Sequence, residues 1–193
     1  RKKWLERMGL DEHAFLLLSV SRHHPEKRIG TLLEGFEEAS NVRRMGLILV
    51  GNGPIQFWVK RKASGISNVR LVPSTDTRED LARLMASSDL LIHGSASETF
   101  GLVVAESLCS GLPIVVPNRG GAVDFASPDF AEVYRAGDAG DLSTSILNAL
   151  ESDLDERRKA AHSYAEKQIS TVEEHFDALF SFYSDLLNEV KSG

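Results

Sequence analysis

Short apolar runs alternate with amphipathic stretches along most of the chain. Runs rich in Leu, Ile and Val are typical of buried strands, whereas apolar residues spaced three and four apart are typical of helices. Strands are expected over residues 15–20, 46–50, 68–72, 90–93, 113–116 and 131–134, and helices in the intervals between them. About six strand and helix alternations predict an α/β fold with a doubly wound, mostly parallel, Rossmann-like sheet.

The two ends of the chain lack strands. Residues 1–12 predict a helix that ends at Gly9, and residues 156–168 and 172–190 predict two closing helices. The last helix has an apolar stripe that must cover this sheet or a neighbouring domain. The stripe consists of Phe176, Leu179, Phe180, Tyr183, Leu186 and Leu187.

Composition and charge narrow the class of protein. The 193 residues, 42% of them hydrophobic, suffice for one domain, or a domain with a helical tail. The net charge of -6 argues against a nucleic-acid surface. No apolar run reaches about 18 residues, so no transmembrane segment is expected. The chain starts with Arg1 rather than Met, which suggests a fragment.

Cys109 is the single cysteine, so no internal disulfide can form. This fits a reducing compartment, and we expect a cytoplasmic protein, either free or peripheral to a membrane. No basic residue lies near Cys109 in sequence, and a small buried hydrophobe is the expected role.

Residues 95–121 form the stretch around which the other elements can be placed. We expect a helix capped by Ser97 or Thr99 and ended by Gly111. Its expected apolar face is Leu102, Val103, Ala105 and Leu108.

Two carboxylates flank the start of this helix. Glu98 and Glu106 would stand about 12 Å apart on a helix, further than the acid and base of a glycosidase. They are better placed to hold the two ends of one long ligand. Between them, the amides of Phe100, Gly101 and Leu102 are the free donors of a first helical turn, which favours an anion.

The polar loop after the first strand contains Arg22 and Lys27, whose guanidinium and ammonium groups suit a diphosphate. Taken alone, they could equally be two solvated surface cations. Glycines at 51, 53, 120 and 121 follow other strands at the same edge. They indicate either simple turns or a close backbone approach to a ligand.

Several other chemistries lack their motifs. The first strand is not followed by G-x-G-x-x-G, and the chain contains no Walker loop and no G-x-S-x-G elbow. His23 and His24 are adjacent and point apart, and no cluster has the spacing of a metal site. Asp153 and Asp155 are interpreted as capping and solvating residues.

Residues 98–106, which read ETFGLVVAE, resemble the Glu-x7-Glu signature of the group 1 glycosyltransferases. These are retaining nucleotide-sugar transferases of the GT-B fold. The loop with Arg22 and Lys27, the turn GNGP at 51–54, the stretch SGLPIV at 110–115 and the pair Gly120 and Gly121 support the resemblance. It runs over nearly the whole chain and corresponds to the C-terminal, donor-binding half of the GT-B fold.

The resemblance implies a role for each matched residue. Arg22 and Lys27 would bind the diphosphate and stabilise the leaving group in place of a metal, so no metal or other cofactor is expected. Glu98 would bind hydroxyls of the transferred sugar, and Glu106 would hold the ribose. The amides of Phe100, Gly101 and Leu102 would hold sugar and phosphate. Val72 and Pro73 would lie beside the nucleobase.

The sequence departs from the family pattern at five positions. Arg28 stands where Gly usually follows the Lys, and Ser21 where Gly often precedes the Arg. The other three are Ser74, Gly94 and Asp124. None removes a charged ligand, so donor binding is still expected, whereas the loop conformation and the nucleobase preference are less well specified.

The resemblance also implies a domain division. Residues 1–12 would be an interdomain linker helix, residues 13–170 the nucleotide-sugar donor-binding domain, and residues 171–193 an amphipathic helix packed on a missing N-terminal domain. That domain would bind a sugar or lipid-linked acceptor. The full-length protein would transfer a hexose, with GDP-mannose slightly favoured over a UDP-sugar, and the fragment alone would be inactive. The alternatives are a nucleotide-sugar epimerase or phosphorylase of the same architecture, and a non-catalytic sugar- or protein-binding module.

Overall fold

The structure is a computed structural model that describes residues 1–75 and 77–192, with side chains to residue 187. Six parallel strands form one sheet in the order β3-β2-β1-β4-β5-β6. The strands are β1 (Phe15–Val20), β2 (Met45–Val50), β3 (Val69–Val72), β4 (Leu90–Ile92), β5 (Ile114–Pro117) and β6 (Ala131–Tyr134). The predicted doubly wound α/β sheet is confirmed.

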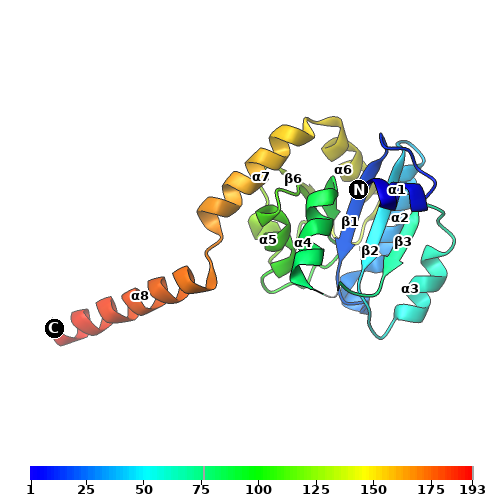
Figure 1. Cartoon of the computed structure of the whole chain (residues 1–193). Helices are drawn as coiled ribbons and strands as arrows, with labels where there is room; N and C mark the ends of the chain where they lie inside the picture. Colours follow the sequence, from blue (N-terminus) through cyan, green and yellow to red (C-terminus); the bar gives the residue numbers. More distant parts are fainter. Residues whose placement is uncertain (76, 193) are drawn as a thin grey trace.

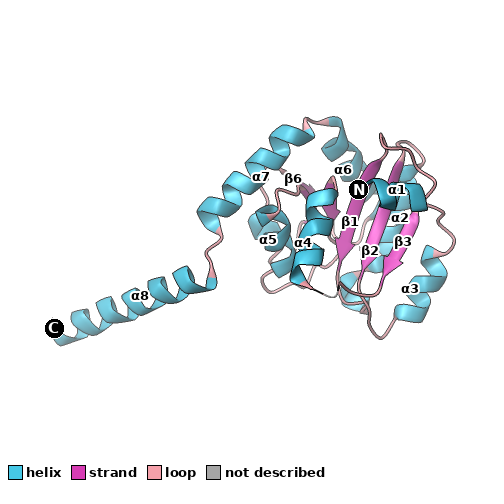
Figure 2. Ribbon diagram, viewed as in Figure 1, coloured by secondary structure: helices cyan, strands magenta, loops and turns pink. Residues whose placement is uncertain are grey.

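Helices cover both faces of the sheet (Figures 1 and 2). One apolar core joins the sheet to α2 (Ile29–Ser40), α3 (Gln56–Ala63) and α6 (Ala139–Glu151). The core on the opposite face includes α1 (Lys2–Arg7), α4 (Arg78–Ser87), α5 (Leu102–Cys109) and α7 (Leu154–Gln168). Because both faces are covered, the inner strands β2 and β5 are buried along their whole length.

The strand order reverses between β1 and β4, the two neighbours at the centre of the sheet. Open α/β sheets bind ligands in the crevice outside the carboxyl ends of the strands at such a switch point. Two short 3₁₀ helices, η1 (Pro25–Lys27) and η2 (Val123–Phe125), lie in loops that follow β1 and β5. The fold therefore brings the loop of Arg22 and Lys27 next to the loop that leads into α5.

Helix α5, which was predicted from residues 95–121, differs from its prediction in two respects. Its N-cap is Gly101, in the left-handed conformation with φ of 88°, and neither Ser97 nor Thr99 caps it with a side chain. Its buried face includes Val104, whereas Leu102 is 69% exposed. The helix starts later than the polar pattern suggested, which rotates Leu102 out of the core. Gly111 follows the helix with φ of 66°, as its predicted role as a stop requires.

Cys109 is exposed at the end of α5, so the prediction that it is a buried hydrophobe was wrong. In the last turn of this amphipathic helix, Leu108 faces the core, and the next residue, Cys109, therefore faces outward. Partial burial and the nearby Glu106 carboxylate raise the pKa of the Cys109 thiol. Cys109 is therefore less readily ionised than a free cysteine.

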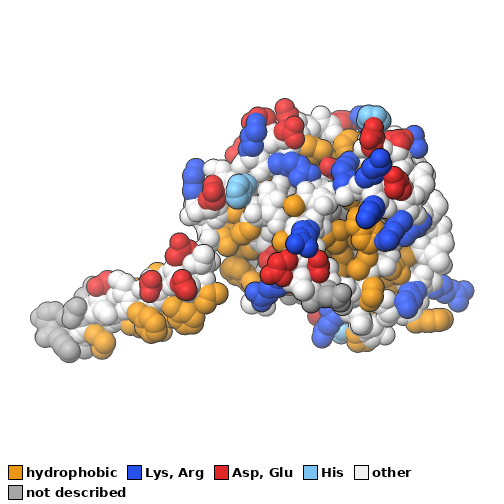
Figure 3. Space-filling model, viewed as in Figure 1, with side chains coloured by type: hydrophobic (Ala, Val, Ile, Leu, Met, Phe, Trp, Pro, Cys, Tyr) orange, Lys and Arg blue, Asp and Glu red, His pale blue; other side chains and the backbone are white. Residues whose placement is uncertain are grey.

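The helix α8 (Val172–Ser192) extends away from the sheet and its covering helices (Figure 1). Hydrophobic side chains gather along one side of it (Figure 3), including Phe176, Phe180 and Tyr183. These three side chains are 48%, 63% and 52% exposed. The sheet thus does not cover the stripe that the sequence predicted. No helix in residues 1–75 and 77–192 is long and apolar enough to cross a membrane.

Candidate functional site

A cleft of about 890 Å³ lies at the carboxyl ends of β1, β2 and β3, opposite the start of α5. It brings together eight of the nine predicted site residues, which come from three separate segments of the chain. These are Arg22, Lys27, Pro73, Glu98, Phe100, Gly101, Leu102 and Glu106. Val72 does not line the cleft, because its side chain packs partly buried against the core below.

The loop that carries the cations is held by its neighbour after β2. The amide of His23 donates to the carbonyl of Asn52 at 2.9 Å, and the His23 ring is fully buried. A Cβ on Gly51 would lie 1.9 Å from the Ser21 carbonyl oxygen, and one on Gly53 would lie 2.5 Å from that of His23. These glycines therefore let two loops pack together, which is a simpler reason than close approach to a ligand.

Arg22 and Lys27, the two predicted phosphate ligands, differ in how firmly their side chains are held. The Arg22 side chain is 63% exposed, and its guanidinium is 3.8 Å from the Glu26 carboxylate. The Lys27 side chain is only 16% exposed and donates from Nζ to Glu98 Oε1 at 2.6 Å. Lys27 is thus already fixed in the cleft, whereas Arg22 can turn toward an incoming anion.

Glu98 has the most strongly perturbed acid group of the cleft. The nearby His93 ring, together with Lys27, lowers the pKa of Glu98 to about 2, although burial opposes this shift. The carboxylate is therefore ionised at neutral pH and can only accept hydrogen bonds. An acceptor beside a fixed ammonium suits a ligand that carries hydroxyl groups next to phosphate.

The mouth of α5 supplies backbone donors. In the part of the chain that the structure describes, the amides of Leu102 and Val103 donate to no backbone carbonyl. Both residues line the cleft, as do Phe100 and Gly101. Free amides at a helix N-terminus bind anions because the helix dipole adds to their partial positive charge.

Two glycines hold this mouth in place. The amide of Gly121 donates to the Glu98 carbonyl at 2.7 Å. A Cβ on Gly121 would lie 2.4 Å from the Thr99 carbonyl oxygen, and one on Gly120 would lie 2.9 Å from that of Ala96. The loop after β5 thus packs directly on the loop that carries Glu98.

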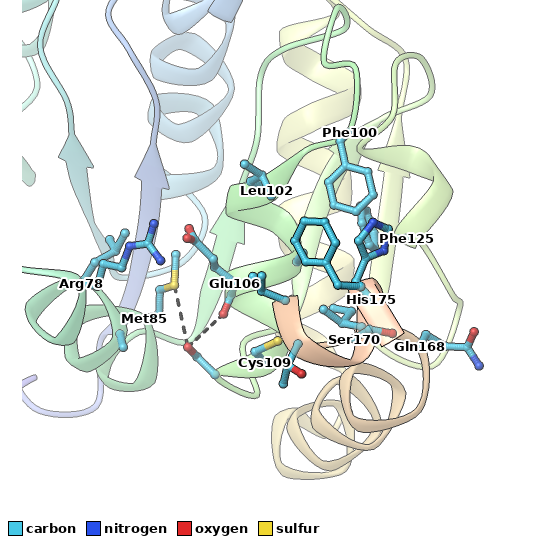
Figure 4. A pocket seen from close by; sticks show the side chains of 18 residues that line it. Arg78, Met85, Phe100, Leu102, Glu106, Cys109, Phe125, Gln168, Ser170 and His175 are labelled. Carbon is cyan, nitrogen blue, oxygen red and sulfur yellow. Dashed lines mark hydrogen bonds between the residues drawn. The ribbon is translucent and has the colours of Figure 1, made fainter. Parts of the chain in front are cut away.

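Glu106 lies on the exposed flank of α5 and also lines a second, more apolar hollow of about 920 Å³ (Figure 4). This hollow lies between α4, α5 and the link from α7 to α8, and includes Phe176 of α8. Phe100 lines both cavities and contacts Phe125 edge to face, with 5.3 Å between ring centroids. Phe100, Leu102 and Glu106 therefore form a wall shared by the cleft and the apolar hollow.

The sequence predicted no role for one residue that reaches the site. His93 follows β4 and is 3% exposed, and its Nε2 lies 3.4 Å from Glu98 Oε1. The only sequence signal is a histidine that ends an apolar strand, five residues before Glu98. Within the described residues, no three His, Cys, Asp or Glu side chains are grouped so that they could hold a metal ion.

Comparison with known proteins identifies relatives. A model of the family "Glycosyl transferases group 1" matches residues 1–168. The sulfoquinovosyl transferase SQD2 of Arabidopsis thaliana is 30% identical over 168 residues, which cover 83% of this chain and 29% of that protein. A GDP-mannose-dependent alpha-mannosyltransferase of Mycobacterium tuberculosis is 33% identical over 117 residues, which cover 56% and 27% of the two chains.

Solved structures share the fold. Anabaena Alr3699/HepE in complex with UDP superposes with a TM-score of 0.80 at 22% identity, over 95% of this chain and 52% of that one. The chain spans less than a third of the two curated relatives and about half of this structural neighbour. The parallel sheet corresponds to one half of a GT-B glycosyltransferase, as the sequence predicted. The family match over residues 1–168 shows that the chain belongs to the group 1 glycosyltransferases.

Proposed function

We propose that this chain is the donor-binding half of a retaining glycosyltransferase that transfers a hexose from a nucleoside diphosphate sugar. The observation that carries the proposal is the composition of the cleft. Arg22, Lys27 and the free amides of α5 surround a space for phosphates, while Glu98 and Glu106 lie at its two sides. A nucleotide sugar has the matching order of groups: sugar hydroxyls, diphosphate and ribose hydroxyls.

Each group has a specific task in this proposal. As the bond between the sugar and the phosphate oxygen breaks, negative charge grows on the leaving nucleoside diphosphate. Arg22, Lys27 and the amides of Leu102 and Val103 stabilise that charge. No metal is required, because the two side-chain cations and the helix amides perform the same electrostatic task.

The two carboxylates recognise the donor. Glu98 accepts hydrogen bonds from hydroxyls of the transferred sugar, and Glu106 accepts them from the ribose. Pro73 lies in the loop after β3 at the nucleobase end of the cleft. Ser74 and Thr75 line the same part, so they replace Val72 in the proposed nucleobase site.

We favour GDP-mannose slightly over a UDP-sugar as the donor. The support is the histidine-rich start of the first loop and the segment from Asn118 to Gly121, which resemble mannosyltransferase relatives. One relative is a GDP-mannose-dependent alpha-mannosyltransferase, whereas one structural neighbour was solved with UDP. The acceptor, a sugar or a lipid-linked sugar, would bind through a second domain. We assign residues 1–12 to the interdomain linker and residues 171–193 to a helix that packs on that domain.

Calorimetric titration of the chain with GDP, UDP, ADP, GDP-mannose and UDP-glucose tests the proposal. We expect at least one nucleotide to bind with a Kd below about 1 mM, roughly 4 kcal/mol of binding free energy. Arg22→Ala and Glu106→Ala should each weaken it about tenfold, a typical cost of losing one charged hydrogen bond. Lys159→Ala, which removes an exposed lysine of α7, is the matched control and should have no effect.

Failure of all five ligands to bind below about 1 mM would exclude the proposed site. Unchanged affinity in both Arg22→Ala and Glu106→Ala would favour a non-catalytic binding module instead. We also expect no sugar transfer by this chain alone, because a cleft between two domains is incomplete in either one. Transfer by the isolated chain would contradict the two-domain arrangement.

A further inference from the structure

His93 is a buried side chain beside the cleft to which the proposed function gives no task. Its backbone is held on both sides: its amide donates to the Val115 carbonyl at 2.9 Å, and its carbonyl accepts the Tyr134 hydroxyl at 2.9 Å. The position of the ring is therefore set by the sheet. Glu98, in contrast, lies in the loop between β4 and α5.

The ring has an unsatisfied polar atom that points to a partner. His93 Nε2 is buried and makes no hydrogen bond of good geometry within the described residues. An unpaired buried donor costs about 1–3 kcal/mol, so its retention needs a reason. The nearest acidic oxygen is Glu98 Oε1 at 3.4 Å, only slightly beyond a normal hydrogen bond.

Lys27 competes for the same oxygen. Its Nζ donates to Glu98 Oε1 at 2.6 Å, so the lysine nitrogen and His93 Nε2 both lie near one carboxylate atom. Gly94 permits the Lys27 backbone to pack closely here, because a Cβ at this position would lie 2.6 Å from the Lys27 carbonyl oxygen. Glu98 Oε2 has no hydrogen bond or ion pair among the described residues and is the atom left for a sugar hydroxyl.

These contacts suggest what changes when a donor binds. A bound diphosphate would compete with Glu98 for the Lys27 ammonium, and Glu98 would then lose its closest partner at the moment when its orientation matters. A shift of a few tenths of an ångström would bring Oε1 within normal hydrogen-bond distance of His93 Nε2. A carboxylate can only accept, so Nε2 must carry the proton in that contact.

We propose that His93 is a positioning residue that holds Glu98 through Nε2 while Lys27 serves the donor diphosphate. The inference rests on the proposed function, since it requires Glu98 to bind the donor sugar. It adds a residue from the buried strand end to a site otherwise made of loop and helix residues. His93 itself does not touch the donor.

A pair of matched amide variants tests this role. The side-chain nitrogen of Gln falls where Nε2 of histidine lies, whereas that of Asn falls where Nδ1 lies. Both variants bury one amide group, so they differ mainly in their reach to Glu98. The measurement is calorimetric binding of GDP against GDP-mannose and of UDP against UDP-glucose, with thermal midpoints recorded for every variant.

We expect His93→Asn to weaken sugar-nucleotide binding about tenfold and to leave binding of the free nucleoside diphosphate within about twofold. His93→Gln should restore sugar-nucleotide binding to within about threefold of the parent chain. If His93→Asn does not fold, His93→Met fills the space of the ring without a donor and takes its place in the comparison. The proposal would be overturned if His93→Gln bound the sugar nucleotide as weakly as His93→Asn or His93→Met. It would also be overturned if a variant lost as much affinity for the free nucleoside diphosphate as for the sugar nucleotide.

Glu98→Ala separates this inference from the proposed function. If it removes the difference between sugar-nucleotide and free nucleotide while His93→Asn does not, only the role of His93 fails. If Glu98→Ala leaves that difference unchanged, the sugar contact of Glu98 is wrong and the role of His93 falls with it.

Discussion

The Lys27 and Glu98 pair shows how one ion pair can be both structural and functional. Their side chains are 16% and 20% exposed, and Nζ and Oε1 are 2.6 Å apart. At this burial the pair is screened less than a surface ion pair. In the ligand-free protein the two groups satisfy each other, so the cleft does not contain two uncompensated charges.

The pH dependence of stability should reveal how His93 and Lys27 stabilise the Glu98 carboxylate. The pKa of Glu98 is lowered from 4.5 to about 2, so its contribution is complete above pH 4.5 and is lost as the pH falls toward 2. We expect the parent chain to lose about 2 kcal/mol more unfolding free energy between pH 5 and pH 2 than Glu98→Gln. Denaturant unfolding at several pH values measures this difference. Parallel curves for the two proteins would contradict it.

Arg28 is both the C-cap of η1 and the N-cap of α2, and its backbone conformation is strained. Its φ of 48° and ψ of 40° place it in the left-handed region, and it is the only non-glycine residue of the described chain with positive φ. Glycine usually follows the lysine in the family pattern, and the structure explains why. A left-handed turn at this position directs the chain from the phosphate loop into α2.

The strain at Arg28 can be measured by two substitutions. Arg28→Ala removes the guanidinium, which lies near Gly137, and keeps the backbone strain. Arg28→Gly removes both. We expect the Gly variant to be more stable than the Ala variant by about 1 kcal/mol, the cost of a left-handed conformation for a residue with a Cβ. Urea denaturation gives the difference; an Ala variant at least as stable as the Gly variant would show that the turn is unstrained.

At the scale of elements, the six strands follow their predictions within one or two residues. Continuous apolar runs such as 15–20 and 46–50 are unambiguous because both faces of a parallel sheet are buried. The capping of α5 was harder to predict. Gly101 is the N-cap because the loop of Gly120 and Gly121 packs beside the start of the helix. Such a contact between distant segments leaves no local pattern in the sequence.

The candidate site was also predictable only where its residues have a local sequence pattern. Arg22, Lys27, Glu98 and Glu106 were identifiable because charged residues follow strands at one predicted edge. His93 was not, since a lone histidine at a strand end looks like any core residue. Val72 was assigned to the cleft although successive residues of a strand face opposite sides of the sheet, and its own side chain faces the core.

Contact between two loops predicts a strong effect at Gly121. An added Cβ would lie 2.4 Å from the Thr99 carbonyl oxygen and 2.8 Å from its carbon, so Gly121→Ala must move the loop that carries Glu98. We expect a loss of about 1–3 kcal/mol in stability and at least tenfold weaker nucleotide binding. Gly65→Ala, whose Cβ would lie 3.5 Å from the Lys62 carbonyl oxygen, an ordinary contact distance, should change neither. Normal binding by Gly121→Ala would show that the loop position is unimportant.

On the scale of the whole molecule, the sheet and its covering helices form one body, and α8 leaves it (Figure 1). Only the first turn of α8, with Val172, His175 and Phe176, lines the apolar hollow beside α5. Beyond Phe176, the described side chains up to residue 187 are exposed, except Leu179, which is half-buried. An exposed apolar stripe of this length is characteristic of a surface that another domain or protein covers.

Because the side chains of residues 177–187 bury little against the sheet, removal of residues 177–193 should hardly affect the fold. We expect a chain ending at Phe176 to keep its thermal midpoint within about 2 °C and its nucleotide affinity within about twofold, since few buried apolar contacts are lost. The intact chain should self-associate more at high concentration, as measured by sedimentation velocity. Phe180→Ser with Tyr183→Ser should reproduce the effect of truncation, whereas Asp177→Ala with Ser184→Ala, outside the stripe, should not. A drop of more than about 5 °C on truncation would mean that α8 packs on this domain, and that its stripe is not reserved for a partner.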